Sequence, residues 1–104
     1  MKIKDINEAE FNEVIAADTL TVVDFWAAWC GPCMMLGPVM EEVAGELEDV
    51  AFYKVNVDDH QELAIKFGID AIPCVIFFKN GAAVGRSVGL VDKAAMIARI
   101  NEVK

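Results

Sequence analysis

Two cysteines stand three positions apart in the segment Trp29–Cys33, which reads Trp-Cys-Gly-Pro-Cys. Cβ atoms of residues three apart on a helix are about 5–6 Å apart, and a disulfide needs about 3.5–4.5 Å. A disulfide between Cys30 and Cys33 can therefore close with little distortion and still be open to reduction. The spacing predicts reversible thiol–disulfide chemistry at these two residues.

The cysteine segment lies where a predicted strand gives way to a predicted helix. Residues 21–27 are β-branched and aromatic, which predicts a strand buried on both faces. Residues 34–47 carry apolar side chains at helical spacing, and Pro32 suits a first helical turn. We therefore expect Cys30 at the helix N-terminus, where unpaired N–H groups and the helix dipole favour a thiolate. Pro38 is expected to kink this helix.

Length and composition predict one small domain spanning residues 1–104. The chain is 56% apolar, enough for a hydrophobic core, and its net charge of −8 argues against nucleic acid as a partner. Three cysteines are too few for a secreted disulfide scaffold. We see neither a signal peptide in residues 1–6 nor an apolar run long enough to span a membrane, so we expect a cytoplasmic protein.

The remaining pattern alternates strands and helices, which indicates an α/β fold. Further strands are expected at residues 2–6, 50–57, 74–79 and 82–88, with helices at residues 7–15, 59–68 and 92–103. Asn7 with Glu10 forms a predicted capping box, and Asp92 is the predicted cap of the last helix. Asn80-Gly81 predicts a hairpin that adds an antiparallel edge to an otherwise parallel sheet.

Several short segments, in fixed order, match the pattern of one family. They are Val23-Asp24-Phe25-Trp26-Ala27, Trp29-Cys30-Gly31-Pro32-Cys33, Pro38, Lys54-Val55-Asn56-Val57-Asp58, Ile72-Pro73, Phe78-Lys79-Asn80-Gly81 and Val88-Gly89. Through these residues the chain resembles the thioredoxin family from its first predicted strand to its last predicted helix. The resemblance implies a thioredoxin fold, with a central five-stranded mixed β-sheet flanked by four α-helices, and reduction of protein disulfides as the activity.

The resemblance also implies roles for single residues. Cys30 would attack a substrate disulfide, and Cys33 would release the product with help from Asp24 as a buried acid. A carboxylate in a buried strand is costly when charged, so Asp24 should tend towards its neutral form unless it reaches a surface at the strand end. Lys54 matches the lysine near that acid, although a plain surface lysine is the alternative. The implied substrate surface consists of Trp29, Gly31, Pro32, Ile72, Pro73 (a cis-proline) and Gly89.

The implied partners are disulfide-containing substrate proteins and a thioredoxin reductase that restores the dithiol. The protein is expected to be a monomer that needs no cofactor beyond its redox-active disulfide. Zinc bound by the three cysteines and His60 is a weaker interpretation, since the chain has no second Cys-x-x-Cys pair and His60 is expected at the surface. A binding module that serves as the accessory subunit of a partner enzyme is the alternative function. The Gly-Pro dipeptide disfavours an oxidase or isomerase.

Three further residues carry expectations of their own. Trp26 is expected in the core. Met34 stands where family members commonly carry lysine, which weakens electrostatic support for a thiolate. Cys74 follows Pro73, where many members have threonine, and alternation along a strand predicts that it points away from the cysteine loop. We expect an inert buried thiol there; a regulatory or dimer-forming cysteine is the alternative.

Overall fold

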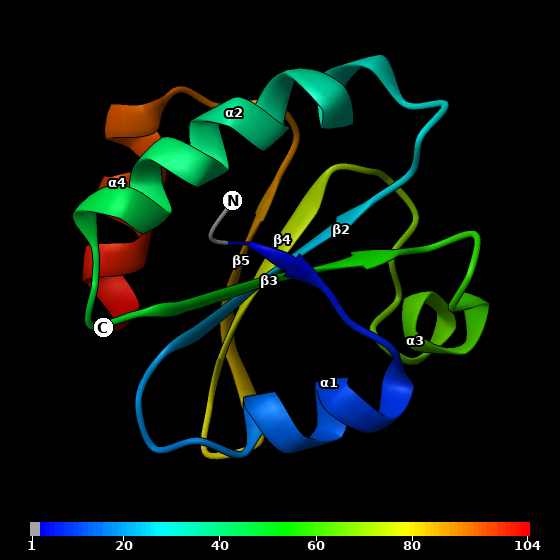
Figure 1. Cartoon of the computed structure of the whole chain (residues 1–104), viewed down its shortest axis with the longest axis horizontal. Helices are drawn as coiled ribbons and strands as arrows, with labels where there is room; N and C mark the ends of the chain where they lie inside the picture. The colour runs from blue at the N-terminus through cyan, green and yellow to red at the C-terminus, as the bar shows by residue number, and fades with distance from the viewer. Residues whose placement is uncertain (1–2) are drawn as a thin grey trace.

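The fold alternates strands and helices in a computed structural model that describes residues 3–104 (Figure 1). The strands are β1 (Lys4–Asp5), β2 (Thr21–Trp26), β3 (Ala51–Asn56), β4 (Cys74–Lys79) and β5 (Ala82–Val88). The helices are α1 (Glu8–Ile15), α2 (Gly31–Glu46), α3 (Gln61–Lys66) and α4 (Lys93–Val103). The predicted class, a five-stranded mixed sheet with four helices, is confirmed. Within residues 3–104, no helix is both long and apolar enough to cross a membrane.

The strands form one sheet in the order β1-β3-β2-β4-β5. β1, β3 and β2 pair in parallel, and β4 pairs antiparallel with both β2 and β5. The hairpin between β4 and β5 turns at Asn80 and Gly81, whose φ angles of 54° and 83° are both positive. This geometry is the one that an Asn-Gly turn adopts, because both central residues must tolerate positive φ.

Helices cover both faces of the sheet. In Figure 1, α2 and α4 lie on one side of the strands, and α1 and α3 lie on the other. On the α2 side, Val22, Phe52 and Phe77 pack in one apolar cluster. On the other side, Phe25, Phe78 and their neighbours form a second cluster. β2 lies between the two layers, so its inner residues are buried on both faces, as predicted.

Local sequence signals place most helix ends correctly. Asn7 and Glu10 form the predicted capping box at α1, and the Asp92 carboxylate accepts from the backbone N–H of Ala95 at α4. Pro38 lies inside α2. The predicted helix at residues 59–68 is shorter than expected: α3 begins after His60, which makes no side-chain cap, while residues 57–59 form a turn.

Strand ends differ slightly from their predicted positions. The first strand was expected at residues 2–6 but is confined to Lys4–Asp5, and Lys2 lies outside the described residues. The third strand covers Ala51–Asn56 instead of residues 50–57. β2 ends at Trp26, which leaves residues 27–30 as the loop that leads into α2.

Candidate active site

Cys30 and Cys33 form a disulfide at the start of α2, with a Cα–Cα distance of 5.2 Å. Cys30 is the N-cap residue, and its Sγ accepts a hydrogen bond of 3.2 Å from the backbone N–H of Cys33. Pro32 occupies the first turn, where its missing N–H removes no helical hydrogen bond. The predicted placement of both cysteines is therefore confirmed. An N–H group aimed at Cys30 Sγ is the contact that stabilises a thiolate after reduction.

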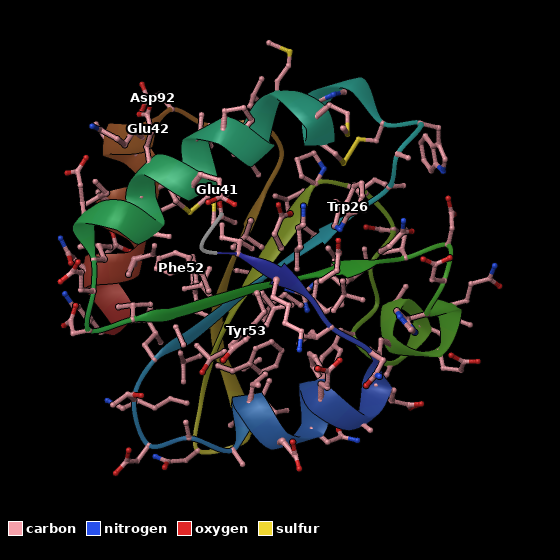
Figure 2. All side chains as sticks on the ribbon, viewed as in Figure 1. Trp26, Glu41, Glu42, Phe52, Tyr53 and Asp92 are labelled. Atoms are coloured by element: carbon pink, nitrogen blue, oxygen red, sulfur yellow. A yellow bond between two sulfur atoms is a disulfide. The ribbon has the colours of Figure 1, made fainter. Side chains whose placement is uncertain are left out.

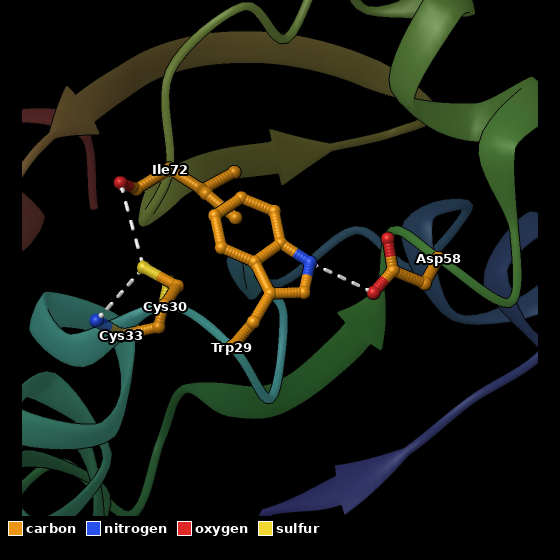
Figure 3. Close-up of a disulfide and its surroundings, with 5 residues drawn as sticks. All are labelled: Trp29, Cys30, Cys33, Asp58 and Ile72. Carbon is orange, nitrogen blue, oxygen red and sulfur yellow. Dashed lines mark hydrogen bonds between the residues drawn. A yellow bond between two sulfur atoms is a disulfide. The ribbon is translucent and has the colours of Figure 1, made fainter.

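Trp29 and Ile72 border the disulfide (Figure 3). Trp29 is 71% exposed, and its indole N–H donates to Asp58 Oδ2 over 2.9 Å. The carbonyl oxygen of Ile72 lies 3.8 Å from Cys30 Sγ. Trp29 and Ile72 also line a pocket of about 170 Å³, whose other walls are Val57, Ala64 of α3 and residues 69–71. The disulfide is thus flanked by an apolar depression.

Pro73 and Gly89 are joined beside this depression. The Ile72–Pro73 peptide bond is cis, and the Gly89 N–H donates to the Pro73 carbonyl oxygen over 2.8 Å. Gly89 has a φ of 93°, which favours glycine, and a Cβ added there would meet nothing within 4 Å. In this free chain, backbone conformation is therefore the visible reason for glycine at position 89.

Asp24 lies in the middle of β2 and is only 4% exposed. Its Oδ1 has no hydrogen-bond partner among the described residues. Burial raises the pKa of Asp24 to about 7; the charge of Lys54 opposes this shift and the charge of Asp5 adds to it. The side chain can therefore gain or lose a proton near neutral pH.

A mostly apolar cavity of about 530 Å³ joins Asp24 to the redox pair. We call it the Asp24 cavity; its lining comprises Ile3, Asp24, Trp26, Cys33, Met34, Gly37, Pro38, Met40, Glu41 and Lys54. Glu41 projects from α2 towards the sheet (Figure 2). Cys33 and Asp24 therefore border the same space.

Lys54 is half-buried at this cavity, which is not the environment of a plain surface lysine. Its ammonium nitrogen lies 3.9 Å from Asp5 Oδ2 and 4.8 Å from the centre of the Trp26 ring.

Trp26 was expected in the core, but it is only partly buried, and its indole N–H donates to Asp5 Oδ1 over 2.9 Å. The polar N–H keeps this ring near the surface, where it can reach a carboxylate.

Cys74 opens β4 and is 1% exposed. It packs among the residues under α1 and α3, whereas the redox disulfide belongs to α2 on the other side of the sheet. Its expected direction, away from the cysteine loop, therefore agrees with the structure. Burial raises the pKa of the Cys74 thiol.

Asp5 and Asp58 were not singled out in the sequence, yet each binds the indole N–H of a tryptophan at the site. Asp58 ends a matched segment and could have been noticed as a partner for an exposed Trp29. Asp5 carried no such signal. No group of three or more His, Cys, Asp or Glu side chains within residues 3–104 is placed to hold a metal ion, so the zinc interpretation finds no ligand set there.

Comparison with known proteins gives consistent matches over almost the whole chain. Residues 2–102 match the family model described as Thioredoxin. A thioredoxin from Chlamydia caviae is 45% identical over 100 residues, which cover 96% of this chain and 97% of that protein. The solved structure of Malassezia sympodialis thioredoxin aligns with a TM-score of 0.89 at 39% identity, covering 99% of this chain and 94% of that one. A Plasmodium falciparum thioredoxin structure aligns with a TM-score of 0.90 at 33% identity, covering 98% and 100%.

Proposed function

Because the chain belongs to the thioredoxin family, and is a thiol–disulfide oxidoreductase with Cys30 and Cys33 as its redox pair, we propose that it works as a reductase of disulfides in substrate proteins. One observation supports this most directly. Cys30 Sγ caps α2 and accepts the Cys33 N–H beside an apolar depression. This placement favours a thiolate on the side where a substrate can approach.

The first step joins the enzyme to its substrate. In the reduced protein, the Cys30 thiolate attacks one sulfur of the substrate disulfide. The substrate S–S bond breaks, a Cys30–substrate bond forms, and the other substrate sulfur leaves as a thiolate that takes a proton from solvent. The hydrogen bond from the Cys33 N–H holds Cys30 Sγ at the helix end for this attack.

The second step releases the substrate. Asp24 accepts the proton of the Cys33 thiol across the Asp24 cavity, and Cys33 Sγ attacks Cys30 Sγ. The mixed disulfide breaks, the second substrate thiolate leaves, and the Cys30–Cys33 disulfide forms. Two electrons have then passed to the substrate. Lys54 borders the same cavity and supplies the positive charge that faces Asp24.

A small surface around Cys30 would receive the substrate chain. Its members are Trp29, Gly31, Pro32, Ile72, Pro73 and Gly89. Trp29 and Ile72 line the depression beside the disulfide, and Gly89 is tied to Pro73 by a backbone hydrogen bond. A mostly apolar surface that can also offer backbone groups suits an enzyme that accepts many proteins.

The family implies disulfide-containing substrates and recycling by a thioredoxin reductase. For this chain we propose that residues 1–104 act as one domain, as a monomer and without binding a membrane or nucleic acid. A reducing compartment such as the cytoplasm would keep the dithiol available.

Replacing each cysteine singly tests this function. Cys30→Ser should abolish reduction of a disulfide substrate such as oxidised insulin, whereas Cys33→Ser should accumulate the Cys30–substrate mixed disulfide. A Cys30→Ser protein that still supports full function in cells, with substrate binding intact, would favour the alternative of an accessory binding module.

The direction of electron flow has its own test. Equilibration with a dithiothreitol couple measures the reduction potential of the Cys30–Cys33 dithiol–disulfide couple. We expect a strongly reducing potential. A potential close to that of a strong oxidant such as the periplasmic enzyme DsbA, about −120 mV, would contradict the reductase assignment and leave the oxidoreductase chemistry intact.

A further inference from the structure

Three charged side chains lie in one row across three adjacent strands. Asp5 of β1 is in register with Lys54 of β3, and Lys54 is in register with Asp24 of β2. Side chains in register on adjacent strands point to the same face of a sheet, here the face covered by α2. Lys54 therefore stands between two carboxylates that compete for its charge.

The contacts show which of the two carboxylates lies within ion-pair distance of Lys54. Lys54 Nζ lies 3.9 Å from Asp5 Oδ2, while within residues 3–104 it makes no ion pair with Asp24 inside 4.0 Å. Asp5 also accepts the Trp26 indole N–H over 2.9 Å, and the Lys54 ammonium lies against that same ring. Asp5 thus contacts both Lys54 and Trp26, two residues that line the Asp24 cavity.

We propose that Asp5 is a positioning residue for the release step: it holds Lys54 away from Asp24, and so keeps the Asp24 carboxylate a good acceptor for the Cys33 proton. The inference rests on the proposed function, because it concerns the proton acceptor of that reaction. It adds a residue on the edge strand β1 to a site otherwise built from β2, β3 and α2.

The electrostatics around Asp24 agree with this arrangement. Of the groups that face it, Lys54 lowers the pKa of Asp24 and Asp5 raises it, while burial has the largest effect. The thiol of Cys33 and the carboxylate of Glu41 approach from α2, and Cys74 lies on the neighbouring strand β4. A base works best when its pKa lies near the working pH. Freed from Asp5, Lys54 would stabilise the charged form of Asp24 and make it a weaker base.

Asp5→Asn is the decisive variant, because its amide oxygen can still accept the Trp26 N–H while its charge is gone. Asp5 and Asp24 lie two strand spacings apart, about 10 Å. At that distance, and with Asp5 half-exposed, solvent screens the direct effect of its charge on Asp24. Most of the expected shift therefore comes from the released Lys54, and we expect the pH midpoint of Asp24 to fall by about 0.5–1 unit. NMR of the side-chain carboxyl carbon of Asp24 in the oxidised protein measures this midpoint without any turnover.

Kinetics then connect the shift to the reaction. The pH midpoint of mixed-disulfide release should fall by the same amount in Asp5→Asn, and formation of the mixed disulfide should keep its wild-type rate. If the NMR midpoint falls but the release profile does not, Asp5 tunes Asp24 and the catalytic assignment of Asp24 fails. If the NMR midpoint does not fall, the positioning role of Asp5 is wrong, whatever the reaction mechanism.

Two further variants separate this role from a merely structural one. In a Lys54→Met background the effect of Asp5→Asn should shrink to less than half, because the charge that Asp5 diverts is absent. Asp18→Asn makes the same charge change at an exposed position shortly before β2 begins. It should leave the pH midpoint of Asp24 unchanged. Full additivity of Asp5→Asn with Lys54→Met, or an equal shift in Asp18→Asn, would overturn the proposal.

Discussion

Asp24 and Lys54 are directly opposed in the parallel register of β2 and β3, yet they form no ion pair within 4.0 Å in the described part of the chain. A nearby lysine normally lowers the pKa of a carboxyl group. Here burial outweighs that attraction and raises the pKa of Asp24 to about 7. The outcome is a carboxyl group that titrates near neutral pH and lines the same cavity as Cys33.

Asp24→Asn should slow release of the substrate and leave the first step almost unchanged. The amide cannot accept the Cys33 proton, and loss of a positioned general base typically costs at least about 10²-fold in rate. Cys30 needs no such help, because its thiolate is stabilised at the helix N-terminus. Stopped-flow kinetics that resolve formation and decay of the mixed disulfide measure both steps. Equal slowing of the two would argue against this role.

The same substitution should stabilise the fold, by an amount that depends on pH. The pKa of Asp24 rises from 3.8 to about 7 on folding, so between these values the folded state binds more protons than the unfolded state. The contribution of Asp24 to the free energy of unfolding therefore falls as pH rises through this window. We expect the free energy of unfolding of Asp24→Asn to exceed that of the wild type by a margin that grows from pH 4 to pH 8, up to about 4 kcal/mol.

Urea unfolding of the oxidised proteins at several pH values measures this gain. Asp18→Asn, at an exposed turn, is the matched control and should track the wild type. A gap between Asp24→Asn and the wild type that stays constant from pH 4 to pH 8 would show that Asp24 does not titrate in this range.

Removing the positive charge of Lys54 should raise the pKa of Asp24. Lys54→Met keeps most of the side-chain length but removes the positive charge that lowers the pKa of Asp24. We therefore expect the Asp24 midpoint to rise above about 7 and the release step to reach its full rate only at higher pH. NMR of the Asp24 carboxyl carbon and the pH profile of mixed-disulfide release both report this shift. A fall in the midpoint would mean that Lys54 acts mainly by excluding solvent.

Local sequence signals predicted the parts of the site that depend on local chemistry. Cys30 as helix cap, the turn at Asn80-Gly81 and the buried Asp24 follow from short segments whose residue types demand one conformation. The contact of Asp5 with Lys54 depends instead on the register between two strands some 50 positions apart. Nothing in a two-residue edge strand specifies that register, so the role of Asp5 emerged only from the structure.

Trp26 shows the same limit for a single residue. Its position in an apolar run predicted a core ring, and hydrophobic pattern alone cannot say that the indole N–H meets a carboxylate on β1. Likewise, Asp59 looked like a helix start, but α3 begins only at Gln61, after a turn in which the Asp58 N–H is bound by the Asn56 side chain. In both cases a polar contact decided what periodicity could not.

Met34→Lys should lower the pKa of Cys30 in the reduced protein, but only modestly. Position 34 is four residues beyond Cys30, so a lysine there lies on the same face of the helix. Met34 is 54% exposed, and solvent will screen most of an added charge. We expect a fall of a few tenths of a unit at low salt that fades at high salt, measured by the pH dependence of thiolate absorbance.

Met35→Lys is the control for this change, since Met35 is 64% exposed but points to a different side of the helix. Its effect on Cys30 should be smaller. Equal shifts from both lysines would mean that net charge, rather than placement beside Cys30, governs the thiolate.

Cys74 should behave as an inert structural thiol. It is 1% exposed among the apolar side chains under α1 and α3, and burial raises its pKa, so little reactive thiolate forms at neutral pH. Cys74→Thr introduces a side chain of similar size, and we expect turnover within about twofold of the wild type.

In the reduced native protein, an alkylating reagent should label Cys30 first and Cys74 only on unfolding. Mass spectrometry of timed samples reads out the order directly. Rapid labelling of Cys74 in the folded protein, or a Cys30–Cys74 bond after mild oxidation, would show instead that this thiol takes part in redox regulation.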